Sequence, residues 1–181
     1  MEQRKMIRFL TIFLILVFSS TAANAQFGLF KKRDKGAAAE EEVVSDALKE
    51  SLAFLAANAQ AEGVQVTPSG LQYQVVASGG DYGRTPFRAD IVRVRYEGRF
   101  IDGTVFDSKM DPNYMVEFNV SELIPGWKEA LGMMKEGDAW RLFIPPDLAY
   151  GEKGQGDRIP PDQALIFDIE LVEVIRTGLA Q

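Results

Sequence analysis

The sequence predicts an α+β fold in which an antiparallel sheet packs one apolar face against a single short helix, with an amphipathic helix preceding the sheet. Three observations predict this fold. Apolar and polar residues alternate in several short segments between residues 71 and 171, as in strands that have one solvated face. Residues 125–134 instead repeat apolar side chains at helical spacing. Residues 37–61 contain no helix breaker and carry an apolar stripe.

The composition excludes several classes of site. The chain of 181 residues has 20 Lys and Arg against 26 Asp and Glu, and it contains no Cys and no His. Disulfides, thiolate nucleophiles and Cys-based zinc sites are therefore excluded, as are a Ser-His-Asp triad and an imidazole base. A calcium site built from oxygen ligands is compatible with this composition. The net charge of −6 argues against nucleic-acid binding, because phosphate neutralisation needs stripes of Lys and Arg.

The first 25 residues are typical of a secretory signal peptide. Basic residues near the start precede an apolar run over residues 9–18, and Ala23-Asn24-Ala25 provides an A-x-A cleavage site. A helix of ten residues spans about 15 Å, roughly half of a bilayer core. A cleaved signal over residues 1–25 is therefore favoured over an uncleaved membrane anchor, and the protein is expected to be exported.

Residues 26–36 show no periodicity and are predicted to be a flexible, solvated linker. The alternative is that its basic residues contact anionic lipid. An amphipathic helix is predicted over residues 37–63, where Gly63 supplies the stop. Its apolar stripe consists of Val44, Leu48, Leu52, Leu55 and Ala59. Two partners could bury the stripe: the neighbouring domain, or a second copy in a homodimer through residues 37–61.

Residues 64–181 are predicted to form one β-rich domain. A turn at residues 67–70 opens it, and Asp102-Gly103 marks a tight turn between two short strands. The segments predicted as strands or strand pairs are 71–75, 91–97, 100–106, 116–119, 140–144 and 165–171.

One short helix is predicted among these strands. Pro125 suits its first turn, and Trp127, Leu131 and Met134 follow at i, i+4 and i+7. A sheet with one apolar face is buried most simply by wrapping around this helix. The Gly-rich residues 151–156 lead into two prolines, and neither GK[ST] nor a helix follows, so we interpret them as a flexible flap and not as a phosphate loop.

Three runs carry a family resemblance: VRVRYEGRFIDGTVFDSK (92–109), VEFNVSELIPGWKEALGMMKEGDAWRLFIPPDLAYGEKGQG (116–156) and IPPDQALIFDIELVEV (159–174). Together they resemble the FKBP-type peptidyl-prolyl cis-trans isomerases. FLAANAQAEGVQVTPSGLQYQV (54–75) is similar to the helix–domain junction of exported bacterial members of the macrophage infectivity potentiator type. The family fold, an antiparallel sheet of five or six strands wrapped on one short helix, agrees with the packing argued above. Those relatives carry a larger helical dimerisation region than this chain provides.

The resemblance implies a pocket that binds proline. The residues implied to be catalytic are Tyr96, Phe106, Asp107, Trp127, Tyr150 and Phe167, and those implied to bind substrate are Val116, Leu123, Ile124 and Ile159. In this scheme Trp127 forms the floor and three other aromatic residues form the walls. The Ile124 N–H and the Tyr150 hydroxyl are implied to bind substrate carbonyls. Two positions depart from common family choices: Val116, which is often Phe in eukaryotic relatives, and Gln155, which is often His.

The implied reaction is rotation about the Xaa-Pro bond, which breaks no bond and therefore needs no His, Cys, metal or cofactor. The implied substrates are proline-containing unfolded or partly folded polypeptides, and macrolide immunosuppressants are a further implied ligand class. The export signal suggests a role in the folding of exported proteins, in the periplasm by resemblance. The alternative is a binding module whose apolar groove holds unfolded chains, with turnover incidental.

Overall fold

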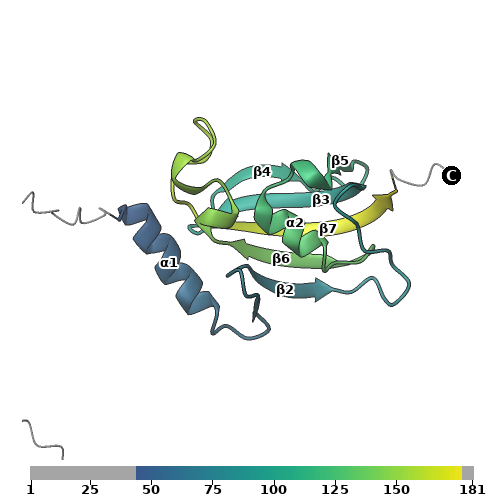
Figure 1. Ribbon diagram of the computed structural model, residues 1–181, viewed down its shortest axis with the longest axis horizontal. Helices are drawn as coiled ribbons and strands as arrows, with labels where there is room; N and C mark the ends of the chain where they lie inside the picture. The colour runs from purple at the N-terminus through teal and green to yellow at the C-terminus, as the bar shows by residue number, and fades with distance from the viewer. Residues whose placement is uncertain (1–43, 177–181) are drawn as a thin grey trace, which may run out of the picture. The chain divides into compact units, whose positions relative to one another are not determined.

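The computed structural model describes residues 44–176 (Figure 1). The predicted signal peptide, the linker and the first seven residues of the predicted helix lie outside this range. None of the helices within it is long and apolar enough to cross a membrane. In chain order the elements are α1 (Asp46–Asn58), β1 (Gln65–Val66), β2 (Gln72–Ala77), β3 (Ile91–Phe100), β4 (Val105–Lys109), β5 (Val116–Asn119), η1 (Val120–Glu122), α2 (Pro125–Leu131), β6 (Ala139–Ile144), η2 (Pro146–Leu148), η3 (Gly151–Lys153) and β7 (Leu165–Ile175), where η marks a 3-10 turn.

The strands form one antiparallel sheet in the order β1-β2-β6-β7-β3-β4, and β5 pairs with residues 91–94 of β3 on the same edge as β4, opposite the edge that pairs with β7. The described residues thus contain seven strands, and the two-residue β1 is the addition to the five or six expected. The long strands β3 and β7 form the centre of the sheet, with Tyr96 opposite Ile169 and Gly98 opposite Phe167. The predicted fold class is confirmed.

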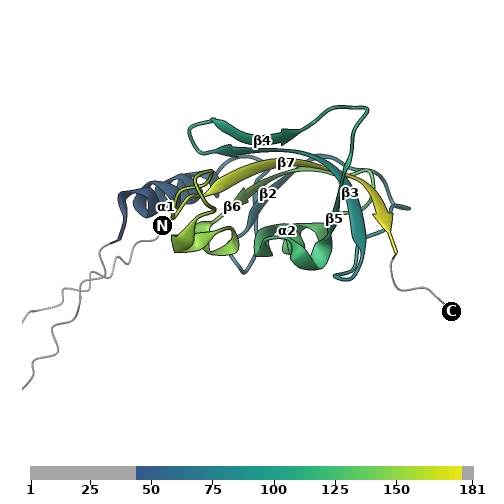
Figure 2. The same cartoon turned by 90° about the horizontal axis from the view of Figure 1, so that it is seen from above.

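The curved sheet wraps around α2, as expected (Figure 2). Trp127, Ala130 and Leu131 of α2 are buried against the sheet, together with Met134 just beyond its end. Gly126 lets the helix approach closely, because a Cβ atom at this position would lie 2.6 Å from Cγ2 of Ile144 on β6. Pro125 occupies the first turn, as its fixed φ favours.

Strict alternation is confirmed in the centre of the sheet but fails at its edge. Val92, Val94 and Tyr96 are all buried on the inner face of β3. On β2 the prediction that Leu71, Tyr73 and Val75 share one buried face is wrong at Val75, which is 42% exposed. Val75 still pairs in register with Trp140, and the register shift follows it, between Val75 and Ala77. Strand β1 pairs only with Gln72 and Tyr73, so β2 is the edge of the sheet at Val75.

The N-terminal helix is shorter than predicted, since it begins at Asp46 and ends at Asn58 instead of covering residues 37–63. Ser45 has an extended backbone, and its Oγ accepts a hydrogen bond from Leu48 N–H (3.0 Å), which fixes the helix start. Residues 59–63 form turns. The part of the prediction over residues 37–43 lies outside the described residues.

Helix α1 packs against the outer face of the sheet, on the side opposite α2. Leu55 is buried with Phe143 and Ala164, and the rings of Phe54 and Phe143 lie 6.1 Å apart. The predicted stripe is partly wrong, because Leu52 is 52% exposed. The buried side of the helix is set by Ser51, Phe54 and Leu55, which contact this outer face of the sheet and the segment that precedes β7.

Candidate active site

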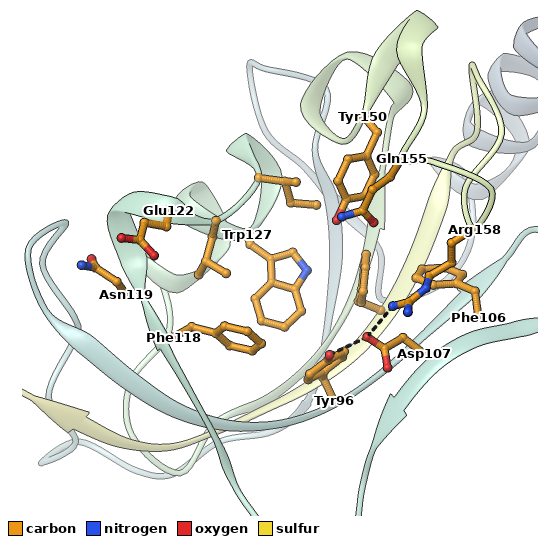
Figure 3. A pocket seen from close by; sticks show the side chains of 13 residues that line it. Tyr96, Phe106, Asp107, Phe118, Asn119, Glu122, Trp127, Tyr150, Gln155 and Arg158 are labelled. Carbon is orange, nitrogen blue, oxygen red and sulfur yellow. Dashed lines mark hydrogen bonds and ion pairs between the residues drawn. The ribbon is translucent and has the colours of Figure 1, made fainter.

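A pocket of about 400 Å³ opens on the concave face of the sheet, beside α2 and the segment that contains η3 (Figure 3). Its lining residues are Tyr96, Phe106, Asp107, Phe118, Asn119, Glu122, Leu123, Ile124, Trp127, Tyr150, Gln155, Arg158 and Phe167. Eight of the ten residues implied by the resemblance are among them. The two that do not line the pocket are Val116 and Ile159.

Four aromatic rings are arranged around the indole of Trp127, which is 4% exposed. The rings of Tyr96, Phe118 and Phe167 meet it edge to face, with centroids at 5.3, 5.9 and 5.3 Å. Phe106 meets Phe167 in the same manner at 5.6 Å. Edge-to-face packing fixes each ring against its neighbours, so the pocket wall is rigid and apolar.

Gly98 on β3 makes part of this arrangement possible. A Cβ atom at position 98 would lie 2.6 to 2.7 Å from ring atoms of both Phe106 and Phe167. These distances are too short for any side chain, so only glycine allows the two rings to meet over β3. Gly98 is not among the site residues that the sequence predicts, because a glycine in a strand indicates a close approach without identifying the group that approaches.

Asp107 provides the carboxylate at the pocket rim. Tyr96 donates from its hydroxyl to Oδ2 of Asp107 (2.7 Å), and Nη1 of Arg158 lies 3.7 Å from the same oxygen. Nζ of Lys109 lies 3.6 Å from Oδ1. Burial, and then the hydrogen bond to Asp107, raise the pKa of Tyr96 above its ordinary value, so this hydroxyl stays a donor.

Tyr150 directly precedes η3 and extends its hydroxyl into the pocket (Figure 3). Burial, followed by the negative charge of Asp107, raises the pKa of Tyr150. The segment interpreted as a flexible flap is an ordered structure, because η3 is followed by a bridge between Gln155 and Ile159. Gln155 N–H donates to the Ile159 carbonyl (2.8 Å), and Ile159 N–H donates to the Gln155 carbonyl (3.2 Å).

Two further N–H groups are available at the pocket. The carbonyl of Ile124 accepts from Lys128 N–H (3.1 Å), whereas the hydrogen bonds within residues 44–176 leave the Ile124 N–H unused. Nε1 of Trp127 is buried and has no hydrogen-bond partner in the described part of the chain. A buried donor such as Nε1 of Trp127 is stabilised by an acceptor that a bound molecule brings.

The two implied residues outside the pocket lie close behind its wall. Val116 is opposite Val94 on β3 and packs against the core, and Phe118, two residues further on β5, contacts Trp127 in its place. Ile159 is 2% exposed in the core. The period of two along β5 could have found Phe118 from the sequence, because residues 116 and 118 face the same side of the strand.

The pocket is also lined by three residues that are not among the predicted site residues: Asn119, Glu122 and Arg158. Arg158 reaches the pocket from the loop after η3, and no periodicity constrains that loop. Within residues 44–176 no group of three or more Asp and Glu side chains is placed to hold a metal ion. The arrangement offers an apolar surface, several hydrogen-bond donors and the carboxylates of Asp107 and Glu122, which is the chemistry for non-covalent binding of an apolar ring flanked by carbonyls.

Comparison with known families agrees with this class of site. Residues 83–172 match the family model described as FKBP-type peptidyl-prolyl cis-trans isomerase. Residues 17–75 match the model of the domain amino-terminal to FKBP-type peptidyl-prolyl isomerase.

Individual proteins show the same similarity. The chain is 49% identical over 126 residues to the FKBP-type 22 kDa peptidyl-prolyl cis-trans isomerase of Escherichia coli, covering 70% of this chain and 60% of that protein. It is 48% identical to the outer membrane protein MIP of Legionella longbeachae, covering 67% and 52%. The crystal structure of a peptidyl-prolyl cis-trans isomerase from Pseudomonas syringae pv. tomato is 38% identical with a TM-score of 0.66, covering 72% of this chain and 94% of that one.

The fold and the site define a sheet-on-helix domain with an aromatic pocket on its concave face. The chain belongs to the FKBP-type peptidyl-prolyl cis-trans isomerase family. It spans about half the length of the curated relatives it matches.

Proposed function

We propose that this protein is a peptidyl-prolyl cis-trans isomerase that accelerates rotation about Xaa-Pro bonds. The observation that carries the proposal is the pocket around Trp127, which combines four aromatic rings with the rim pair of Tyr96 and Asp107. Membership in the family supports it. No nucleophile or metal is needed, because the reaction breaks no bond.

The mechanism follows from the polarity of the amide. Rotation about the bond has a barrier of about 18–20 kcal/mol, because it removes the resonance between nitrogen and carbonyl. The planar amide is more polar than the twisted one, so an apolar pocket disfavours the planar ground state relative to the transition state. A reduction of about 5 kcal/mol in the barrier corresponds to several thousandfold in rate.

The polar groups at the pocket have separate roles in this proposal. The proline ring packs on the indole of Trp127, and the Ile124 N–H and the Tyr150 hydroxyl donate to substrate carbonyls on either side of it. The raised pKa of Tyr150 keeps this hydroxyl protonated. Asp107 fixes the Tyr96 hydroxyl and places a negative charge at the rim, where it favours the positive end of the twisted amide.

The expected site of action is outside the cytoplasm. Residues 1–25 are proposed as a cleaved signal peptide, residues 26–36 as a linker and residues 64–181 as the isomerase domain. The name of the Legionella longbeachae relative describes an outer membrane protein. We propose the periplasm as the compartment, and unfolded exported proteins that contain proline as the substrates.

The proposal is tested by isomerisation of short Xaa-Pro peptides in the presence of the purified protein. Strong acceleration is expected, and Phe106→Ala is expected to reduce kcat/KM at least tenfold because it removes one wall of the pocket. Val105→Ala is the matched control, since Val105 is the preceding residue on β4 and is exposed. Absence of acceleration by the folded wild-type protein would refute the proposal.

A second candidate function is the holding of unfolded chains. It is favoured by exposed apolar side chains in β4 and the segment before β5, namely Val105, Met110, Tyr114 and Met115. Suppression of aggregation of an unfolded protein distinguishes the two functions. If Phe106→Ala and Asp107→Ala abolish isomerisation and leave suppression intact, holding is a separate activity.

Two partner proposals rest on the family and on the helix. Macrolide immunosuppressants are expected to bind the same pocket, and quenching of Trp127 fluorescence on titration would report this.

A homodimer through residues 37–61 would use the exposed side chains of Val44 and Leu52. In analytical ultracentrifugation the wild-type protein is expected to sediment as a dimer and Leu52→Ser as a monomer. A monomeric wild-type protein would contradict the dimer.

A further inference from the structure

Helix α1 is hydrogen-bonded to the segment that leads into β7, more than a hundred residues away in the sequence. Oγ of Ser51, which is 1% exposed, donates to the Asp162 carbonyl (2.8 Å) and accepts from Ala164 N–H (2.8 Å). Oγ of Ser45 donates to Oδ2 of Asp162 (2.5 Å) and also accepts from Leu48 N–H. The N-cap Ser45 and the helical Ser51 therefore both bind Asp162.

Asp162 is in turn hydrogen-bonded to the base of the segment that covers the pocket. Its N–H donates to the carbonyl of Gly151 (2.9 Å), the residue that follows Tyr150. Asp162 is the one non-glycine residue with positive φ (61°) in residues 44–176, and its side chain is buried. A conformation of this kind persists only where the surroundings hold it, and the two serines are part of those surroundings.

Figures 1 and 2 both place α1 beside the yellow-green segment that contains η2 and η3. Even if these hydroxyls were absent, the apolar side of α1 would still cover the outer face of the sheet. A buried hydroxyl such as that of Ser51 costs free energy unless it is hydrogen-bonded, so its two bonds to residues 162 and 164 specify where this loop lies. The loop position in turn sets the position of Tyr150.

We propose that Ser45 and Ser51 are positioning residues, which act through Asp162 to hold residues 150–159 over the pocket. The inference rests on the proposed isomerase function, because it assigns to α1 a role in placing the Tyr150 hydroxyl and the side chains of Gln155 and Arg158 against the substrate. The helix that precedes the domain is then part of the catalytic unit.

Two variants break this connection in different ways. Ser51→Ala removes both buried hydrogen bonds. Ser45→Asp keeps a good helix cap but cannot donate to Asp162 and faces it with a like charge. Asn58→Ala is the matched control, since it removes a hydrogen bond to Gln72 at the other end of the same helix (2.8 Å). Adding Asp162→Asn to Ser45→Asp restores a donor opposite the new carboxylate.

Two readouts on the full-length purified protein test the proposal: amide hydrogen exchange of Asp162 and Gln155, and the kinetics of Xaa-Pro isomerisation. Ser51→Ala and Ser45→Asp are expected to speed exchange at both amides about tenfold or more and to raise KM about threefold or more. Asn58→Ala is expected to change neither by more than about twofold, and Asp162→Asn is expected to rescue Ser45→Asp at least in part.

Three results would overturn the proposal: unchanged exchange in both serine variants, faster exchange with unchanged kinetics, or equal changes in Asn58→Ala. An inactive wild-type protein would instead refute the proposed function. In that case faster exchange confined to the serine variants would still show that α1 holds the segment, and unchanged exchange would refute that contact as well.

Discussion

At the scale of single residues, the pocket depends on one absent side chain and on unpaired hydrogen-bond donors as well as on its aromatic rings. Gly98 has no side chain, and this lets two rings meet over β3. The Trp127 N–H and the Ile124 N–H have no hydrogen-bond partner within the described residues, which leaves both donors unpaired at the pocket. The pocket thus combines a rigid apolar wall with unpaired donors, and each of the following substitutions tests one of these parts.

Gly98→Ala is expected to destabilise the fold by about 1–3 kcal/mol, because its Cβ would overlap the rings of Phe106 and Phe167. Chemical denaturation measures the loss, and kcat/KM is expected to fall with it. Gly132→Ala is the control: Gly132 has a helical φ of −66°, and its added Cβ would meet nothing closer than 3.4 Å. Equal stability of the two variants would contradict the packing described for the pocket.

Tyr150→Phe is expected to lower kcat/KM about fivefold, the equivalent of one neutral hydrogen bond of about 1 kcal/mol. The packing of the ring is retained, so the free energy of unfolding is expected to change little. Tyr114→Phe removes a hydroxyl from an exposed tyrosine outside the pocket lining and is expected to leave the kinetics unchanged. Wild-type kinetics in Tyr150→Phe would exclude a role for its hydroxyl.

The raised pKa of Tyr96 links stability to alkaline pH. The folded state holds this proton more tightly than the unfolded state, where the pKa has its ordinary value of 10.0. The stabilisation is therefore complete below pH 10 and is lost as pH rises further towards the folded pKa. Urea denaturation is expected to show a smaller loss of stability between pH 9 and 11 in Tyr96→Phe than in wild type. Identical pH dependence would contradict this assignment.

At the scale of helices and strands, most of the architecture was predictable because alternation and helical spacing are strong signals in β3, β7 and α2. The errors occur where a local interaction competes with the pattern. The cap at Ser45 starts α1 later than its composition suggests, and Val75 is exposed where β2, beyond its pairing with β1, forms the edge of the sheet. Eight of the residues implied by the family resemblance line the pocket, whereas Arg158 lies in a loop that shows no sequence periodicity.

The buried side of α1 is tested by a pair of substitutions on the same helix. Leu55→Ala is expected to cost about 2–3 kcal/mol, because Leu55 is buried against Phe143 and Ala164. Leu52→Ala is expected to cost less than about 0.5 kcal/mol, since its side chain is half exposed. Thermal or chemical unfolding compares them, and a larger loss in Leu52→Ala would show that the predicted stripe is the buried side after all.

At the scale of the whole molecule, the two faces of the sheet serve different purposes. The concave face packs on α2 and carries the pocket, and α1 covers part of the outer face, where it is hydrogen-bonded to residues 162 and 164. The proposed arrangement places an exported isomerase domain behind a short N-terminal helix. Its processing can be checked on the protein as it is secreted.

Mass spectrometry of the exported protein is expected to find Gln26 as the first residue, because cleavage after Ala25 follows the A-x-A signal. Substitution of Ala25 by a bulky residue, as in Ala25→Phe, is expected to block processing. Retention of residues 1–25 in the wild-type exported protein would support the alternative of a membrane anchor.

Exchange NMR on an Xaa-Pro peptide at equilibrium tests the central claim most directly. The uncatalysed bond interconverts in tens to hundreds of seconds, so the cis and trans signals of the free peptide show no exchange on the subsecond scale. A catalytic amount of wild-type protein is predicted to produce exchange between the two signals, which Asp107→Ala and Phe106→Ala reduce strongly. Signals that shift on binding without any exchange between cis and trans would contradict the claim and identify the pocket as a binding site alone.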